Sequence, residues 1–220
     1  MENTSFDEEL HRLTQQIIAS ENLPIQFDTS HPWVTGHLGN IHSNVMFLAE
    51  SASLTQVEIA EKKCRKEGRV PTAWDQWNVS PADHLFREEL KNANLLEEKE
   101  STLVDDWHCY ITDLIKIVCR VKDFRAKRAQ VQFDLGVRFS PVLQFEIDKI
   151  QPKVVAIMGP TILKETFEGL LKEGHIKLPE GTGHPYIWHY SYVARFPSKT
   201  QIQTQYKNQL NEIRKLSCSS

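Results

Sequence analysis

Short apolar runs alternate along this chain with segments whose apolar residues recur at helical spacing. The clearest run is Lys153–Met158, which is followed at once by Gly159. Three comparable runs lie at residues 44–50, 107–113 and 185–190. Short apolar runs bounded by turn residues are typical of strands that are buried on both faces of a sheet. We therefore predict four strands of one central sheet.

Segments of helical period lie between and around these runs, at residues 5–18, 53–70, 82–98, 139–150, 161–171 and 200–216. Strands that alternate with helices favour a parallel sheet covered by helices on both faces. The expected fold class is α/β, with three αβα layers and a central, mainly parallel four-stranded sheet. A length of 220 residues suits one domain over residues 1–220, with an N-terminal helix at about 5–18 and a C-terminal helix at about 200–216.

Composition narrows the class of protein further. With 40% hydrophobic and 25% charged residues, the chain has the balance of a folded globular protein. No apolar run reaches the roughly 18 residues of a membrane span, and the N-terminal residues lack the pattern of a signal peptide. We expect a soluble protein of the cytoplasm without membrane contact. The net charge of -3 argues against a nucleic-acid coat protein and leaves room for a local basic face.

Cofactor motifs are not found in the sequence. The four cysteines form no CxxC pair, and the nine histidines include no HExxH motif, which argues against zinc and thioredoxin-type sites. The motifs GxGxxG and GxxxxGK[ST] are absent too, which argues against the commonest dinucleotide-binding and NTPase sites. We expect neither a metal nor another cofactor.

Ligands of parallel sheets bind beyond the carboxyl ends of the strands. The residues at those ends are Glu50, Asp113, Gly159 and His189, and Ser191 lies close behind. Two carboxylates and a histidine are therefore predicted to converge on one crevice.

Four short motifs at these strand ends occur in a familiar order. Over roughly residues 40–198 the chain resembles the uracil-DNA glycosylase superfamily, and most closely its iron-sulfur bacterial branch. The motifs GEAPG, YITNxVKCRPP, IKPKVIVALG and YHPSYLLR of that branch correspond here to Ala49–Ser53, Tyr110–Arg120, Ile150–Gly159 and Trp188–Arg195. The cluster cysteines of the branch are missing apart from Cys119, so we expect no iron-sulfur cluster.

The resemblance implies a DNA-repair glycosylase that flips a damaged base and hydrolyses its N-glycosidic bond. His189 would donate a hydrogen bond to the departing base, whose oxygen gains negative charge. Glu50 would polarise the attacking water or offset the positive charge of the sugar. The implied partner is DNA, either duplex or single-stranded, and the enzyme is expected to be a monomer.

The main departure from the family is Asp113, which stands where the family has the asparagine that reads uracil. An ionised carboxylate only accepts hydrogen bonds, so it meets uracil O4 with like polarity. Uracil is disfavoured unless burial raises the pKa of Asp113 from about 3.9 to above 7. The expectation is an altered base preference, for example toward a guanine-like lesion.

Further contacts follow from the same resemblance. Trp77 would stack on the flipped base, although Trp74 and Trp77 would equally suit a core edge, and Ser191 would help to bind the base. Contacts to DNA are expected from Tyr192, Val193, Arg195, Lys116 and Arg120.

Two alternatives stay open at this point. The altered motifs also suit a superfamily member that has lost catalysis and binds nucleic acid or a nucleobase. An unrelated α/β hydrolase of small molecules would need a nucleophile elbow, and the sequence contains none.

Overall fold

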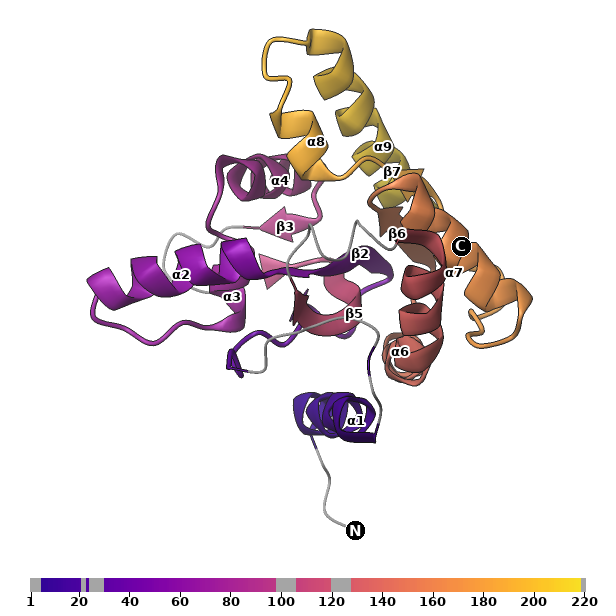
Figure 1. Cartoon of the computed structure of the whole chain (residues 1–220). Helices are drawn as coiled ribbons and strands as arrows, with labels where there is room; N and C mark the ends of the chain where they lie inside the picture. The colour runs from indigo at the N-terminus through magenta and orange to yellow at the C-terminus, as the bar shows by residue number, and fades with distance from the viewer. Residues whose placement is uncertain (1–4, 21–22, 24–29, 98–105, 120–127, 219–220) are drawn as a thin grey trace.

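The computed structural model describes residues 5–20, 23, 30–97, 106–119 and 128–218. Its elements form three layers, with a twisted sheet between two groups of helices (Figure 1). The α/β class and its layers agree with the alternation of strands and helices in the sequence.

The central sheet has five strands, in the spatial order β1 (His37–Gly39), β5 (Tyr110–Cys119), β2 (Val45–Ser53), β6 (Val154–Met158) and β7 (Tyr186–Ile187). The strands β5, β2, β6 and β7 are parallel, and β1 pairs antiparallel with the outer edge of β5. The expected number of four strands is therefore wrong. Three residues are too short a run for β1 to show a period in the sequence.

Helices cover both faces of the sheet. One face packs against α1 (Phe6–Ser20), α6 (Arg128–Ile150) and α7 (Thr161–Lys172). The other packs against α4 (Pro81–Asn92), α8 (Tyr190–Ala194) and α9 (Thr200–Cys218). The terminal helices α1 and α9 correspond to the expected helices at 5–18 and 200–216.

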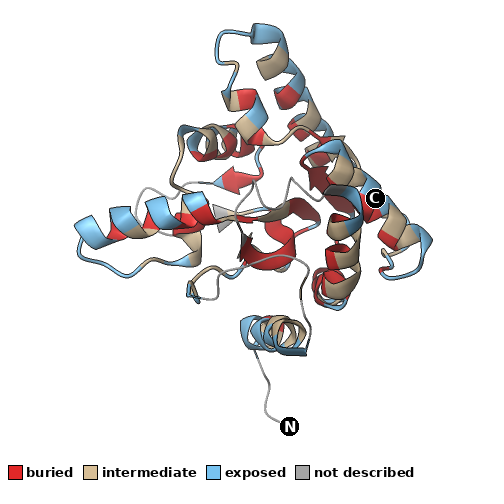
Figure 2. Ribbon diagram, in the orientation of Figure 1, coloured by how far each residue is buried: buried red, intermediate tan, exposed pale blue. Residues whose placement is uncertain are grey.

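The central strands contribute to both apolar layers because successive side chains of a strand point to opposite faces. In β2, Met46 and Leu48 pack on the side of α1, α6 and α7, whereas Val45, Phe47 and Ala49 pack on the side of α4, α8 and α9. Figure 2 shows the resulting belt of buried residues through the middle of the molecule.

Several boundaries differ from those expected. The run at 44–50 continues as β2 to Ser53, because Ala52 and the first residues of α2 (Leu54–Lys66) pack with Val118 in an apolar cluster of their own. The helix expected at 82–98 ends at Asn92. The residues after it form β3 (Leu96–Glu97), which pairs with β4 (Asp106–Trp107).

Helix α6 is much longer than the expected 139–150 and contains Pro141. Proline lacks the N–H that would bond to the carbonyl four residues earlier. The Ser140 hydroxyl donates to that carbonyl, on Val137, at 2.7 Å instead. A local side-chain bond thus satisfies the acceptor that the proline leaves without its helical partner.

A buried ion pair joins β5 to α6. The Lys116 ammonium donates to Glu146 Oε1 at 2.8 Å, and both side chains are wholly inaccessible to solvent. Tyr110 and Thr112 donate their hydroxyls to the same oxygen, each at 2.7 Å. These three donors lie at alternate positions on one face of β5, so the pair fixes which face of the strand meets the helix.

Removal of one partner of this pair is expected to destabilise the protein strongly. Lys116→Met leaves the Glu146 carboxylate buried without its cation, which costs about 3 to 5 kcal/mol of unfolding free energy. In the double variant Lys116→Met with Glu146→Gln, no buried charge lacks a partner. The double variant should therefore lose less unfolding free energy than the two single variants lose together. Chemical denaturation of the four proteins measures this coupling. Strictly additive losses would contradict a direct pair.

Candidate functional site

Neighbouring strands bring the candidate residues to one end of the sheet. Ala49 of β2 lies in register with Asp113 of β5, so Glu50 follows directly beside it. The pKa of Asp113 is raised mainly by burial, and the charge of Glu50 adds a small contribution in the same direction. On the other side of β2, β6 and then β7 lead to His189, which caps the N-terminus of α8. The parallel sheet therefore assembles these groups as its topology requires.

His189 is held as a neutral ring with a defined tautomer. Its Nδ1 accepts hydrogen bonds from the Ser191 hydroxyl at 2.7 Å and from the Ser191 backbone N–H at 3.2 Å. Because a backbone N–H only donates, Nδ1 carries no proton. Burial and the charge of Arg195 lower the pKa of His189 to about 4. The single ring proton at neutral pH is therefore on Nε2, which makes Nε2 a hydrogen-bond donor.

A stack of aromatic rings supports His189. Its ring lies on Tyr190 with centroids 4.3 Å apart, and Tyr190 lies on Phe86 of α4 at 4.8 Å. Phe86 in turn meets Phe47 of β2 edge to face. The imidazole is thus tied to the sheet through packed rings, which restrict its orientation.

Asp113 is a buried carboxyl group in the middle of β5, with 2% of its surface exposed. Its Oδ2 accepts a hydrogen bond from Gln76 Nε2 at 3.2 Å, and its backbone N–H donates to Gly36. Burial raises the pKa of Asp113 to about 7, against a lowering by Lys116 and Gln76. Near neutral pH the group therefore exists in both its charged and its neutral form.

Gln76 was not expected as a site residue. It ends the short helix α3 (Ala73–Gln76), which lies in the tryptophan-containing loop after α2. A single glutamine in such a loop has no sequence pattern that marks it. Only the packing of α3 beside the sheet shows that the Gln76 amide faces Asp113.

Three residues expected at the base or the DNA are instead buried. Trp77 and Val193 belong to the apolar cluster on the α4 side, with 6% and 0% of their surfaces exposed. Neither presents a free face to a base or a DNA stack in this conformation. Lys116 is inside the ion pair with Glu146 and has no reach to a phosphate. This conformation does not present Val193 or Lys116 to DNA, and Trp77 lies at a core edge. Their expected contacts stay predictions.

The remaining expected contacts lie at the surface around α8. Tyr192 is an exposed aromatic residue, and its ring packs edge to face against Trp188 and Phe196. Arg195 is exposed beside it. Arg120 lies outside the described residues.

The described residues offer no ready ligands for a metal cluster. No three His, Cys, Asp or Glu side chains lie together in this part of the chain. Cys64 and Cys109 are buried, and burial raises the pKa of both thiols, which disfavours the thiolate that binds metal. These residues do not fit the iron-sulfur cluster of the bacterial branch.

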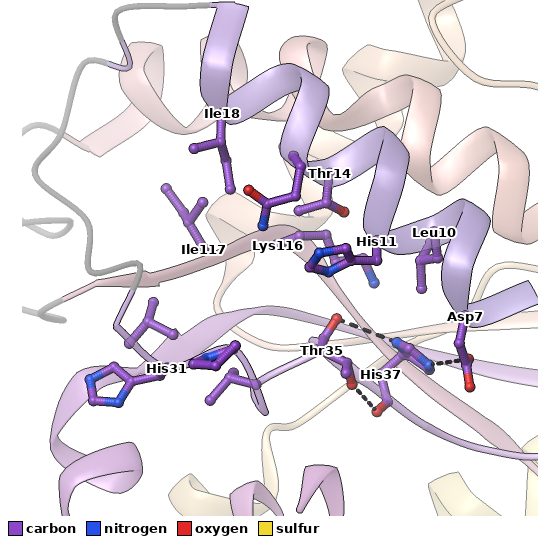
Figure 3. Close-up of a pocket in the computed structure, with 14 residues that line it drawn as sticks. Asp7, Leu10, His11, Thr14, Ile18, His31, Thr35, His37, Lys116 and Ile117 are labelled. Atoms are coloured by element: carbon purple, nitrogen blue, oxygen red, sulfur yellow. Dashed lines mark hydrogen bonds and ion pairs between the residues drawn. The ribbon is translucent and has the colours of Figure 1, made fainter.

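A small cavity of about 100 Å³ lies away from this strand-end cluster, between α1, residues 31–37 and the end of β5 (Figure 3). His37 closes one side of it, with Nε2 3.0 Å from Asp7 Oδ1 of α1. Burial and the charge of Lys116 lower the pKa of His37. Of the candidate residues only Lys116 lines this cavity, so the cavity belongs to the packing of α1 on the sheet edge.

Comparison with protein families agrees with this geometry. The family model described as the Uracil DNA glycosylase superfamily matches residues 37–214, a range that contains every candidate residue above. The chain therefore belongs to the uracil-DNA glycosylase superfamily. Its members are generally DNA glycosylases, hydrolases that act on DNA in base excision repair. Comparison with individual curated proteins gives no significant match.

Superfamily membership overturns the alternative of an unrelated small-molecule hydrolase. The match is to the superfamily as a whole and does not extend to its iron-sulfur branch. None of the helices in the described ranges has the length and apolar content needed to cross a bilayer.

The buried carboxyl group makes stability depend on pH in a defined direction. Because its pKa rises from 3.8 to about 7 in the folded protein, Asp113 binds a proton more tightly in the folded state than in the unfolded chain. Its contribution to stability is present below pH 4 and is lost as the pH rises through about 7. The difference in unfolding free energy between the wild type and Asp113→Asn should therefore change over this pH range, with the wild type losing stability. The expected size is a few kcal/mol, because the pKa shift is about three units. Denaturant titrations at constant ionic strength measure this, and a flat difference would contradict it.

Proposed function

We propose that this protein is a monomeric DNA glycosylase that extrudes a damaged nucleotide and hydrolyses its N-glycosidic bond. The observation that carries the proposal is the neutral His189, whose Nδ1 is occupied by Ser191 and whose Nε2 bears the proton. A water oxygen bonds to C1′, the electrons of the C1′–N bond leave with the base, and the base takes up a proton. The products are the free base and an abasic sugar.

His189 stabilises the charge that develops on the departing base. A neutral imidazole donates its Nε2–H to an oxygen of the base without a prior protonation step. Ser191 has a supporting role, because its two bonds to Nδ1 prevent the other tautomer. Ser191 thus acts through the ring and does not itself need to touch the base.

Glu50 acts at the sugar. A carboxylate at this position stabilises the positive charge that builds up on the ring as the base leaves, and it orients or deprotonates the attacking water. Its position beside Asp113, on the strand next to β5, suits this role.

Asp113 reads the base edge, and its protonation state decides which edge fits. In the ionised form it accepts from an amino or ring N–H, as offered by a guanine-like base. In the neutral form it donates to an oxygen such as uracil O4, as the family's asparagine does. A pKa of about 7 places both forms within the range of physiological pH.

The surface around α8 is the proposed contact with DNA. Tyr192 is the exposed residue that can enter the base stack or stack on an unpaired base. Arg195 supplies a positive charge for a neighbouring phosphate. Tyr192 is exposed whereas Val193 is buried, so Tyr192 is the residue of the two that we expect to meet the DNA.

A second candidate is a superfamily member that binds a nucleobase or nucleic acid without cleavage. The altered motifs favour it, because Asp113 stands in the place of the family's asparagine and Ala49–Ser53 stands in the place of GEAPG. Salt-sensitive DNA binding without release of a base would distinguish this candidate from an enzyme.

Removal of the histidine should abolish most activity. Loss of one donor to a developing anion costs about 10²- to 10³-fold in rate, so His189→Ala should slow base release by that factor. The measurement is alkaline cleavage of oligonucleotides containing uracil, hypoxanthine, xanthine or oxidised guanine, both paired and single-stranded. Tyr192→Ala serves as a comparison, since it should weaken DNA binding and leave the rate of the bound complex much less affected. Equal activity of His189→Ala and wild type would refute the assignment.

A change of pH should alter the base preference of the wild type but not that of Asp113→Asn. As the pH falls from 8 to 6, more Asp113 becomes neutral, so excision of uracil should increase. Asp113→Asn should excise uracil with little pH dependence over this range, and at pH 8 about tenfold faster than wild type. His189 does not titrate there, because its pKa is about 4. A uracil rate that is lower in Asp113→Asn at every pH would count against base reading by Asp113.

A further inference from the structure

Gln76 brings a second polar group to the base-reading carboxyl. Only 5% of Gln76 is exposed, and its Nε2 donates to Asp113 Oδ2 at 3.2 Å. The other end of the amide, Oε1, is buried and has no hydrogen-bond partner among the described residues. Buried carbonyl oxygens in native proteins are almost always bonded, so an orphaned one needs an explanation. A ligand that supplies a donor is such an explanation.

The position of Gln76 is fixed by its helix. Asp75, the residue before it, forms a two-pronged ion pair with Arg69, with N–O distances of 2.8 and 2.6 Å. The same carboxylate accepts the backbone N–H and the hydroxyl of Thr72 at the N-terminus of α3. Trp74 is held by the Arg87 guanidinium, 4.2 Å above its ring. Helix α3 is therefore anchored, and the amide of Gln76 is presented from a fixed backbone.

Gly36 also packs closely against Asp113. A Cβ atom on Gly36 would lie 3.6 Å from Asp113 Oδ2 and 3.0 Å from the Lys116 side chain. The backbone there also has a positive φ of 68°, which favours glycine. The backbone just before β1 therefore lies against the carboxyl group, and Gln76 of α3 supplies the neighbouring polar group.

We propose that Gln76 is a second base-reading residue, so that its Oε1 and the Asp113 carboxylate together accept two adjacent N–H groups of the extruded base. This inference rests on the proposed function and narrows its substrate class. The matching edge is a ring N–H next to an exocyclic amino group, which is the edge of guanine and of oxidised guanine. Uracil has one N–H between two carbonyl oxygens and leaves one acceptor without a donor.

Gln76 is buried, so a base reaches it only when the site opens, and the amide can then turn about its last torsion while the backbone of α3 stays in place. The last torsion of a glutamine side chain is broad and has no strong rotamer wells. In the free protein the Gln76 amide donates an N–H to the Asp113 carboxyl group. It occupies the acceptor to which an N–H of the base would donate after binding. On binding, the base satisfies both the carboxylate and the orphaned Oε1.

The test uses two lesions that differ in one group. 8-Oxoguanine has both the ring N–H and the 2-amino group, whereas 8-oxohypoxanthine lacks the amino group. Wild type should favour 8-oxoguanine in kcat/KM. Gln76→Met preserves side-chain length and removes both polar atoms, so it should lower kcat/KM for 8-oxoguanine about tenfold or more and bring the two lesions close together. Gln205→Met, at an exposed position of α9, is the matched control and should leave the ratio unchanged.

A pH profile tests the hydrogen bond between Gln76 and Asp113, whereas the ratio between the two lesions tests base reading by Oε1. The hydrogen bond from Gln76 favours the charged form of Asp113. Its loss should therefore move the midpoint of the pH dependence of 8-oxoguanine release to higher pH. Thermal unfolding of Gln76→Met checks that the variant is folded. Gln76→Asn, which keeps the amide on a shorter side chain, gives a second folded variant and should recover part of the discrimination.

Binding without cleavage separates this inference from the proposed activity. Oligonucleotides with the 2′-fluoro analogues of the two lesions resist hydrolysis, and fluorescence anisotropy gives their affinities. If wild type distinguishes them and Gln76→Met does not, the role of Gln76 holds even where no base is released. If wild type fails to distinguish the two lesions in binding and in cleavage, the role of Gln76 is overturned. The same holds if Gln76→Met keeps the wild-type ratio, even in an active glycosylase.

Discussion

The buried ion pair between Lys116 and Glu146 is the constraint on which the site depends. It fixes one face of β5 against α6 through three donors to a single carboxylate oxygen. Because side chains alternate along a strand, this choice of face places Asp113 on the side away from α6. A change of register by one residue would put the carboxyl group against α6 and leave Lys116 without its partner. The place of Asp113, the proposed base-reading residue, is therefore decided by an interaction on the opposite face of the strand.

Burial shifts the pKa values of the two central groups of the site, His189 and Asp113, in opposite directions. In both cases it disfavours the charged form, so it keeps His189 neutral and holds part of Asp113 protonated near neutral pH. A neutral histidine is what hydrogen-bond donation to a departing base requires. A carboxyl group that changes charge near pH 7 gives the same pocket two hydrogen-bonding patterns. In the proposed function, the ionised form offers only acceptors, a pattern that an asparagine at this position would not have.

Much of the fold follows from local patterns, because the four parallel strands are apolar on both faces and the helices carry one apolar stripe each. The motif order also placed Glu50, Asp113 and His189 at one end of the sheet. The patterns missed β1, which is three residues long, and Gln76, which is a single polar residue in a loop. They did not reveal that Val193 and Lys116 are buried, since an apolar or basic residue has the same pattern in sequence whether or not its neighbours cover it.

The sequence by itself determined the α/β class, the order of the four parallel strands along the chain and the superfamily, since each rests on residue types and their spacing along the chain. Only the tertiary structure decided which nitrogen of His189 carries the proton, the charge state of Asp113 and the contact between Asp113 and Gln76. These properties depend on burial and on partners that are distant in sequence: Gln76 and Asp113 lie 37 residues apart. Hydrogen bonds and desolvation act through space, so no local pattern of residues records them.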